Sequence, residues 1–134
     1  MTASNASKAI ASKTRKAPRR KEISEHAHQC NTCEWFWLQY PALRKHLFAI
    51  PNGGDRHPVV AAKLKAEGVL RGVSDLFLMV PRGTFHGMFI EMKSRTGSLT
   101  DEQGEFIERA AAQGYATAVC HSFDEARDVI TRYL

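Results

Sequence analysis

Apolar side chains dominate two short stretches in the middle of the chain, residues 74–80 and 86–93, which are separated by the five residues 81–85. A proline and a glycine in a connection of this length are typical of a reversing loop between two strands. Both stretches are apolar at most positions, as in strands that are buried on both faces of a sheet. The pattern therefore predicts a central β-hairpin.

Helix and strand patterns continue on both sides of this hairpin. We expect a first helix over residues 23–40 with Ser24 as its N-cap, and a strand over 47–51 that leads into an Asn-Gly-Gly turn. The later elements are expected at 59–67 (helix), 101–113 (helix), 115–120 (strand) and 123–134 (helix). This order fits an α/β fold, in which a mixed sheet has helices packed on both sides.

The length of 134 residues and the hydrophobic content of 43% indicate one globular domain. The sequence lacks both the run of about 18 apolar residues of a membrane span and the apolar segment of a secretory signal. Its three cysteines are an odd number in a chain without an export signal, which argues against a disulfide framework. We therefore expect a cytoplasmic protein with free thiols.

The net charge of +5 is concentrated at the N-terminus, because residues 1–21 carry seven basic and no acidic side chains. The rest of the chain has 12 basic and 14 acidic residues. Residues 1–22 contain almost no large apolar side chain, so we predict a disordered basic tail before a domain over 23–134. Bulk affinity for nucleic-acid phosphates would reside mainly in this tail.

Two acids and a lysine converge at one end of the predicted hairpin. If residues equidistant from Gly83 pair across the strands, Asp75 lies opposite Glu91. Strand alternation then returns Lys93 to the same face. Like charges opposite each other destabilise a sheet, and one lysine balances only one carboxylate. The spacing therefore predicts an additional cation between the two acids.

This arrangement resembles the PD-(D/E)XK nuclease superfamily, with Asp75 as the aspartate and Glu91, Met92 and Lys93 as the E-x-K triplet. Three longer segments, IPNGG, KLKAEGVLRGVSDLFL and FIEMKSRTGSLTDEQGEFIE, are similar to the VRR-NUC family of virus-type replication and repair nucleases. The likeness covers about residues 24–134 and implies a restriction-endonuclease-like core with a mixed central sheet flanked by helices. Ser74 departs from it, where we expect proline.

The resemblance implies a metal-dependent DNA endonuclease. Asp75, Glu91 and the backbone carbonyl of Met92 would bind Mg²⁺ or Mn²⁺, since hard cations prefer oxygen ligands. Lys93 would orient the attacking water or stabilise the developing negative charge. The family includes nucleases that cleave Holliday junctions and flaps, which implies branched DNA as substrate, a role in DNA repair, and a bacterial or phage-infected cytoplasm as the compartment.

Two more side chains match positions near the metal site of the resembled family. Glu25 matches an acid of the first helix, although an acid in a first turn also favours the helix dipole. Gln103 matches a glutamine near the catalytic lysine, although it also completes a capping box with Thr100. Gln103 is in phase with the apolar stripe of its helix, which must face the sheet. Glu25 would act at the metal, directly or through water, and Gln103 would fix Lys93 or the attacking water.

Basic and aromatic side chains suggest the partners. Arg71 is the preferred phosphate contact because its loop directly precedes Asp75, while Lys63 and Lys65 on the short helix are also typical of solubilising charges. The adjacent Trp35, Phe36, Trp37 and Leu38 cannot share one helix face, so some must contact the sheet edge, DNA or a second subunit. We expect a homodimer, whose two-fold symmetry suits paired cuts in a junction.

Two other functions remain open. The acids and lysine could form a plain buried ion pair in a non-catalytic DNA-binding module with a basic arm. The chain could also be a zinc-dependent interaction protein, because the first helix holds His26, His28, Cys30 and Cys33. However, no second cysteine pair follows, and the two histidines lie about 200° apart around the helix. Ordinary helix residues account for this cluster better than zinc ligands do.

Overall fold

The computed structural model of the protein describes residues 17–52 and 57–134. The predictions for the rest of the basic tail and for the two glycines of the Asn-Gly-Gly turn lie outside the described residues. Every predicted helix and strand is present, with ends that differ by at most two residues, and a 3₁₀ helix, η1, is added. The elements are α1 (Glu25–Gln39), η1 (Pro41–His46), β1 (Leu47–Ala49), α2 (Pro58–Ala66), β2 (Leu76–Leu78), β3 (Met88–Met92), α3 (Asp101–Ala112), β4 (Ala116–Cys120) and α4 (Phe123–Tyr133).

The four strands form one mixed sheet in the order β1-β2-β3-β4. The first three strands are antiparallel, and β4 runs parallel to β3. In the β2–β3 hairpin, Leu76 pairs with Ile90 and Leu78 pairs with Met88, which is the register predicted about Gly83. One further step along this register places Asp75 opposite Glu91.

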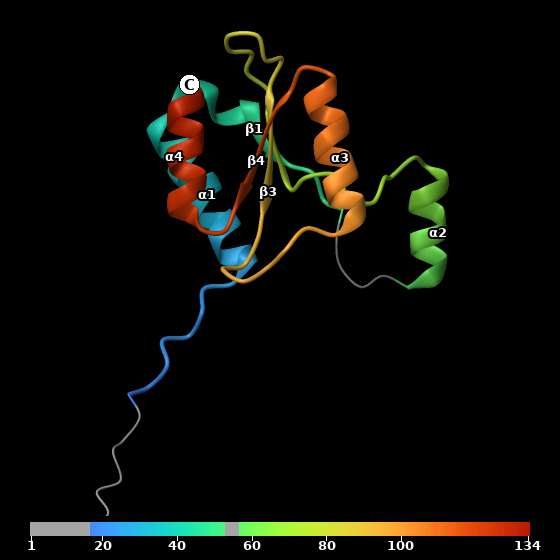
Figure 1. Ribbon diagram of the computed structural model, residues 1–134, viewed down its shortest axis with the longest axis horizontal. Helices are drawn as coiled ribbons and strands as arrows, with labels where there is room; N and C mark the ends of the chain where they lie inside the picture. Colours follow the sequence, from blue (N-terminus) through green and yellow to red (C-terminus); the bar gives the residue numbers. More distant parts are fainter. Residues whose placement is uncertain (1–16, 53–56) are drawn as a thin grey trace, which may run out of the picture.

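Helices cover both faces of the sheet, as the pattern predicted. α1 and α4 lie together on one face and α3 lies on the other (Figure 1). The core between the sheet, α1 and α4 is made of fully buried side chains, among them Phe36, Leu76, Leu78, Ile90 and Ile130. Burial of each such side chain contributes about 1.5–3 kcal/mol, so this core holds the strands that carry the acidic residues.

An aromatic cluster packs α3 against the face of the sheet opposite α1 and α4. The ring of Phe89 on β3 lies 4.6 Å from Phe77 and 5.0 Å from Phe106 of α3, measured between centroids. Tyr115 completes the cluster at 5.3 Å from Phe89. These contacts fix the position of α3, and with it the position of Gln103 in its first turn.

The aromatic run of α1 is accommodated largely within the chain. Phe36 is fully buried, and Trp35 lies edge-to-face against Phe123 of α4. The guanidinium of Arg44 in η1 lies 5.0 Å from the ring centroid of Trp37. The run therefore contacts several surfaces, as predicted: α4 lies against Trp35 and η1 against Trp37, while Leu38 is 81% exposed. The second subunit stays a prediction.

α2 differs from the other α-helices because it has no buried residue and stands apart from the sheet (Figure 1). Val59 and Val60 on this helix are 70% and 47% exposed. Of the helices that the structure describes, none has the length and apolar character that a membrane span requires.

Candidate functional site

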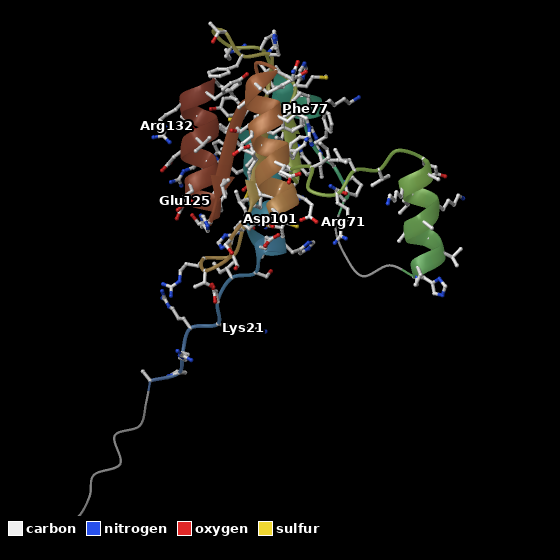
Figure 2. The ribbon with its side chains drawn as sticks, turned by 45° about the vertical axis from the view of Figure 1, so that its right-hand side comes forward. Lys21, Arg71, Phe77, Asp101, Glu125 and Arg132 are labelled. Carbon is white, nitrogen blue, oxygen red and sulfur yellow. The ribbon has the colours of Figure 1, made fainter. Side chains whose placement is uncertain are left out.

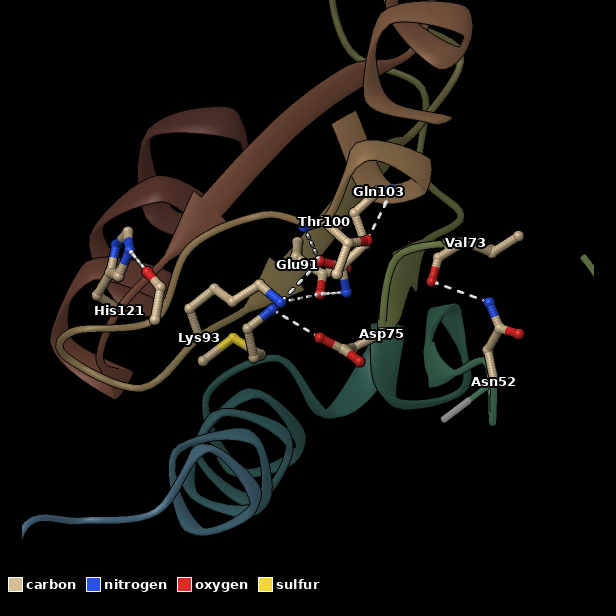
Figure 3. A network of polar contacts seen from close by, with 10 residues as sticks. Asn52, Val73, Asp75, Glu91, Lys93, Thr100, Gln103 and His121 are labelled. Carbon is tan, nitrogen blue, oxygen red and sulfur yellow. Dashed lines mark hydrogen bonds and ion pairs between the residues drawn. The ribbon is translucent and has the colours of Figure 1, made fainter. Parts of the chain in front are cut away.

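Asp75, Glu91 and Lys93 converge at one end of the β2–β3 hairpin (Figure 3). Asp75 immediately precedes β2, Glu91 lies near the end of β3, and Lys93 directly follows that strand. Glu91 is only 1% exposed and Lys93 only 8% exposed. The ammonium nitrogen of Lys93 lies 3.3 Å from Oε1 of Glu91, so the predicted ion pair is formed and buried.

Backbone hydrogen bonds hold Asp75 from both neighbouring segments. The N–H of Met92 donates to Oδ2 of Asp75 at 2.7 Å, and the N–H of Ile50 donates to its backbone carbonyl at 2.8 Å. The side chain is therefore held through Oδ2, and the bond from Met92 does not use Oδ1.

Gln103 connects the lysine to Glu91 and also caps α3. Its Oε1 accepts hydrogen bonds from Nζ of Lys93 at 2.8 Å and from the N–H of Thr100 at 2.9 Å. Its Nε2 donates to Oε1 of Glu91 at 2.8 Å. The two roles that the sequence left open, structural cap and site residue, are thus performed by the same amide group (Figure 3).

The carboxylates carry more negative charge than the lysine balances. The pKa of Glu91 is raised from 4.5 to about 7, first by burial and then by the charge of Asp75, while Lys93 opposes the shift. Burial also raises the pKa of Asp75, against the lowering effect of its hydrogen bond from Met92. Oε2 of Glu91 is buried and finds no hydrogen-bond partner among the described residues.

These features fit a hard divalent cation. Oε2 of Glu91 is left without a hydrogen-bond partner among the described residues, and the carboxylate of Asp75 lies opposite Glu91, one step beyond the Leu76–Ile90 pair. Mg²⁺ is commonly held by one or two carboxylates and several waters, so a pair of acids is sufficient. Over residues 17–52 and 57–134, no three His, Cys, Asp or Glu side chains gather as a metal-binding group. Further ligands would therefore be water or backbone carbonyls such as that of Met92.

Glu25, in the first turn of α1, is exposed and lies outside the buried network. Its negative charge nevertheless contributes to the raised pKa of Asp75 and of Glu91, so the fold brings it near the two acids. At this position it can act on the site through charge or through bound water.

The three predicted DNA contacts divide into two groups. Arg71 is exposed and lies near Asp101 at the start of α3, whereas α2, which carries Lys63 and Lys65, stands apart from α3 and the sheet (Figure 2). Lys63 is also within 4.0 Å of Glu67 in the same helix. Arg71 borders a cavity of about 180 Å³. This cavity is lined by Asn52, Arg71, Gly72, Thr100, Glu102 and Gln103.

Sequence reasoning missed the contribution of Asn52, which it treated only as a turn residue. Its Nδ2 donates to the carbonyl of Val73 at 3.3 Å and thereby ties the β1 end to the loop before Asp75. The IPNGG segment contained the signal, but spacing along the chain could not reveal a partner 21 residues away.

Within the helix cluster considered as a zinc site, His26 and Cys30 contact each other at 3.5 Å, and His28 has a structural role. Nδ1 of His28 accepts a hydrogen bond from the N–H of Phe123 at 3.1 Å, which joins α1 to the start of α4. Burial, with a smaller contribution from Cys30, raises the pKa of the Cys33 thiol to about 11 and disfavours the thiolate that zinc needs. The three cysteines are free, as predicted.

Comparisons with known proteins agree with this geometry. The sequence profile of the VRR-NUC domain matches residues 15–124. A solved structure described as a VRR_NUC domain protein is similar with a TM-score of 0.74 and 31% sequence identity, covering 84% of this chain and 89% of that chain. No curated protein matches the sequence. Because the profile spans most of the chain, this protein belongs to the VRR-NUC family of nuclease domains.

Proposed function

We propose that the protein is a Mg²⁺- or Mn²⁺-dependent DNA endonuclease that hydrolyses phosphodiester bonds. Membership of a nuclease-domain family supports the reaction class. The observation that carries the metal requirement is Oε2 of Glu91, a buried carboxylate oxygen without a hydrogen-bond partner among the described residues. Burying a carboxylate oxygen without a partner is costly, and a divalent cation shared with Asp75 would remove that cost.

The metal site would use Asp75, Glu91 and the backbone carbonyl of Met92. A divalent cation at this position supplies charge that polarises the scissile phosphate and lowers the pKa of bound water. The hydrogen bond from the N–H of Met92 holds Asp75 through Oδ2, so Oδ1 would be the oxygen that binds the cation.

Lys93 is oriented for a role at the reacting phosphate. Two of its three N–H donors are occupied by Oε1 of Gln103 and Oε1 of Glu91 in the described structure. The third can donate to the attacking water or to a phosphate oxygen. Because Lys93 is only 8% exposed, this interaction is little weakened by bulk solvent. Gln103 would act through Lys93, and Glu25 would help to hold the metal, directly or through a hydrogen-bonded water.

Arg71 is the residue placed best to hold DNA at the site, since it lies on the loop that leads into Asp75 and borders the adjoining cavity. Lys63, Lys65 and the basic tail would add contacts to more distant phosphates. Such contacts position the strand without reading its sequence, in agreement with selectivity for DNA structure.

The proposal includes branched DNA, a Holliday junction or a flap, as substrate and a homodimer as the working form, as in phage or prophage repair. What supports a dimer is the unpacked α2 rather than the aromatic run of α1. A nine-residue helix is marginal in water without packing, and Val59 and Val60 are exposed on it. Sedimentation should give a dimer for the wild type and a monomer for Val60→Glu. A wild-type monomer at micromolar concentration that still makes paired junction cuts would contradict this part.

A cleavage panel tests the function directly. Labelled linear, flap and four-way DNA are incubated with the protein in Mg²⁺, in Mn²⁺ and in EDTA, with Asp75→Asn as the matched variant. We expect cleavage of branched DNA by the wild type in either metal and none in EDTA or by the variant. Binding of all substrates without cleavage in any metal would favour the non-catalytic DNA-binding module, and cleavage in EDTA would refute the metal site.

A further inference from the structure

The loop between α2 and β2 meets α3 at a single glycine. Gly72 has a φ of +90°, and a Cβ placed on it would lie 2.5 Å from the carbonyl carbon and oxygen of Glu102 and 2.9 Å from the amide nitrogen of Gln103. These are backbone atoms in the first turn of α3, so they cannot rotate aside as a side chain could. A residue with a side chain would force the loop and the helix apart.

This contact joins the two halves of the site. Gly72 follows Arg71 and lies three residues before Asp75. It packs against the backbone of Glu102 and Gln103. Asp75 is the proposed metal ligand, whereas Gln103 orients Lys93 and Glu91. The glycine therefore sets how far the loop with Asp75 lies from the helix that holds the lysine.

We infer that Gly72 is a positioning residue. It allows the loop that carries Arg71 and Asp75 to pack directly against the first turn of α3. This packing places the proposed metal ligand, Asp75, close to Gln103, which binds the lysine. The inference rests on the proposed nuclease function, since it assigns Asp75 and Gln103 their roles. Gly72 itself contacts neither metal nor substrate. Its effect is transmitted through the distance between loop and helix.

The chain contains a matched control for this inference. Gly68 has a φ of +96°, close to that of Gly72, but a Cβ placed on it meets nothing within 4 Å. Alanine at either position suffers the same backbone strain, because both require the left-handed region that L side chains rarely adopt. Only alanine at position 72 also pushes against α3. The difference between the two variants therefore isolates the contact.

The experiment compares wild type, Gly72→Ala and Gly68→Ala for thermal unfolding, Mg²⁺ affinity by calorimetry, and kcat at saturating DNA. We expect Gly72→Ala, in its folded fraction, to bind Mg²⁺ at least tenfold more weakly and to lose at least tenfold in kcat. Gly68→Ala should stay within twofold of wild type in both. Equal behaviour of the two variants, or a Gly72→Ala protein with wild-type affinity and kcat, would overturn the inference.

A second variant covers the case in which Gly72→Ala does not fold. One extra glycine inserted after Gly72 lengthens the loop without adding a Cβ, and surface loops tolerate such insertions. It should reproduce the loss of Mg²⁺ affinity, while the same insertion after Gly68 should not, and a silent insertion after Gly72 would refute the positioning role. If the wild type binds Mg²⁺ but cleaves no DNA, the proposed function fails, and the affinity comparison still decides the role of Gly72.

Discussion

Replacing Glu91 by glutamine should stabilise the metal-free protein at alkaline pH while abolishing Mg²⁺ binding and cleavage. The amide keeps the shape of the side chain and can still accept hydrogen bonds from Gln103 and Lys93 through its oxygen. It removes a negative charge whose second oxygen is buried without a partner in the described structure. The negative charge of Glu91, which the proposed function requires, should therefore lower the free energy of unfolding when metal is absent.

The pKa shift gives the sign and the size of this effect. The pKa of Glu91 rises from 4.5 to about 7 on folding, so between these pH values the folded state binds a proton that the unfolded state has released. The free energy of unfolding must then fall as the pH rises through this range, and the loss is complete above pH 7. At about 1.4 kcal/mol per pH unit, the loss is about 3 kcal/mol, as an upper bound for a group paired with Lys93.

Urea unfolding followed by tryptophan fluorescence measures this prediction. In EDTA, wild type and Glu91→Gln should have similar stability near pH 4.5, whereas at pH 8 the variant should be more stable by up to about 3 kcal/mol. With an m-value of about 2 kcal/mol per molar, its urea midpoint would rise by about 1.5 M. Mg²⁺ at 100 times its Kd should add about 2.7 kcal/mol to the wild type and nothing to the variant.

The control is Glu105→Gln, which removes an exposed acid from α3 and should leave the pH dependence unchanged. The reasoning would be refuted by a Glu91→Gln protein that is less stable than wild type at pH 8 in EDTA. In that case Lys93 alone compensates the buried charge, and the unpaired oxygen no longer argues for a metal.

Three further predictions concern activity and DNA binding. Asp75→Asn should abolish cleavage in Mg²⁺ while its DNA affinity, measured by fluorescence anisotropy, stays within about twofold of wild type, because phosphate contacts elsewhere remain. Gln103→Ala should lower kcat by about 10- to 100-fold, the usual effect of removing a group that orients a site residue, and wild-type kcat would contradict its link to Lys93. Deleting residues 1–21 removes seven cations and should flatten the salt dependence of duplex binding by a log–log slope of up to about 6 without lowering the Tm. An unchanged slope would exclude the tail from DNA binding.

The hairpin and its acids were predictable because they depend on local rules. Alternation in strands, a short loop centred on Gly83 and one register are enough to place Asp75 opposite Glu91 and Lys93 on the same face. The helix ends were predictable for the same reason, since Ser24 and Thr100 are N-cap residues whose partners lie three residues away.

The contacts that sequence could not supply join segments far apart in the chain. The aromatic run of α1 suggested a second subunit because the sequence pattern could not predict that α4 packs against Trp35 and η1 against Trp37. Likewise, no local pattern distinguishes Gly72 from other loop glycines, because the contact that requires a glycine is with the backbone of Glu102, 30 positions later. The 3₁₀ helix η1 was missed because its apolar spacing is too short to form a period.

Gln103 links the stability of the fold to the assembly of the site. The same Oε1 accepts from the backbone N–H of Thr100, which starts α3, and from Lys93, while Nε2 holds Glu91. The first turn of α3 and the buried charges therefore share the amide group of Gln103. Because the buried carboxylates destabilise the metal-free fold and a bound cation removes that cost, metal binding should tighten this turn as well as the acids. Hydrogen exchange of the first-turn amides of α3 should slow when Mg²⁺ is added, and exchange that is unaffected by Mg²⁺ would separate the cap from the metal site.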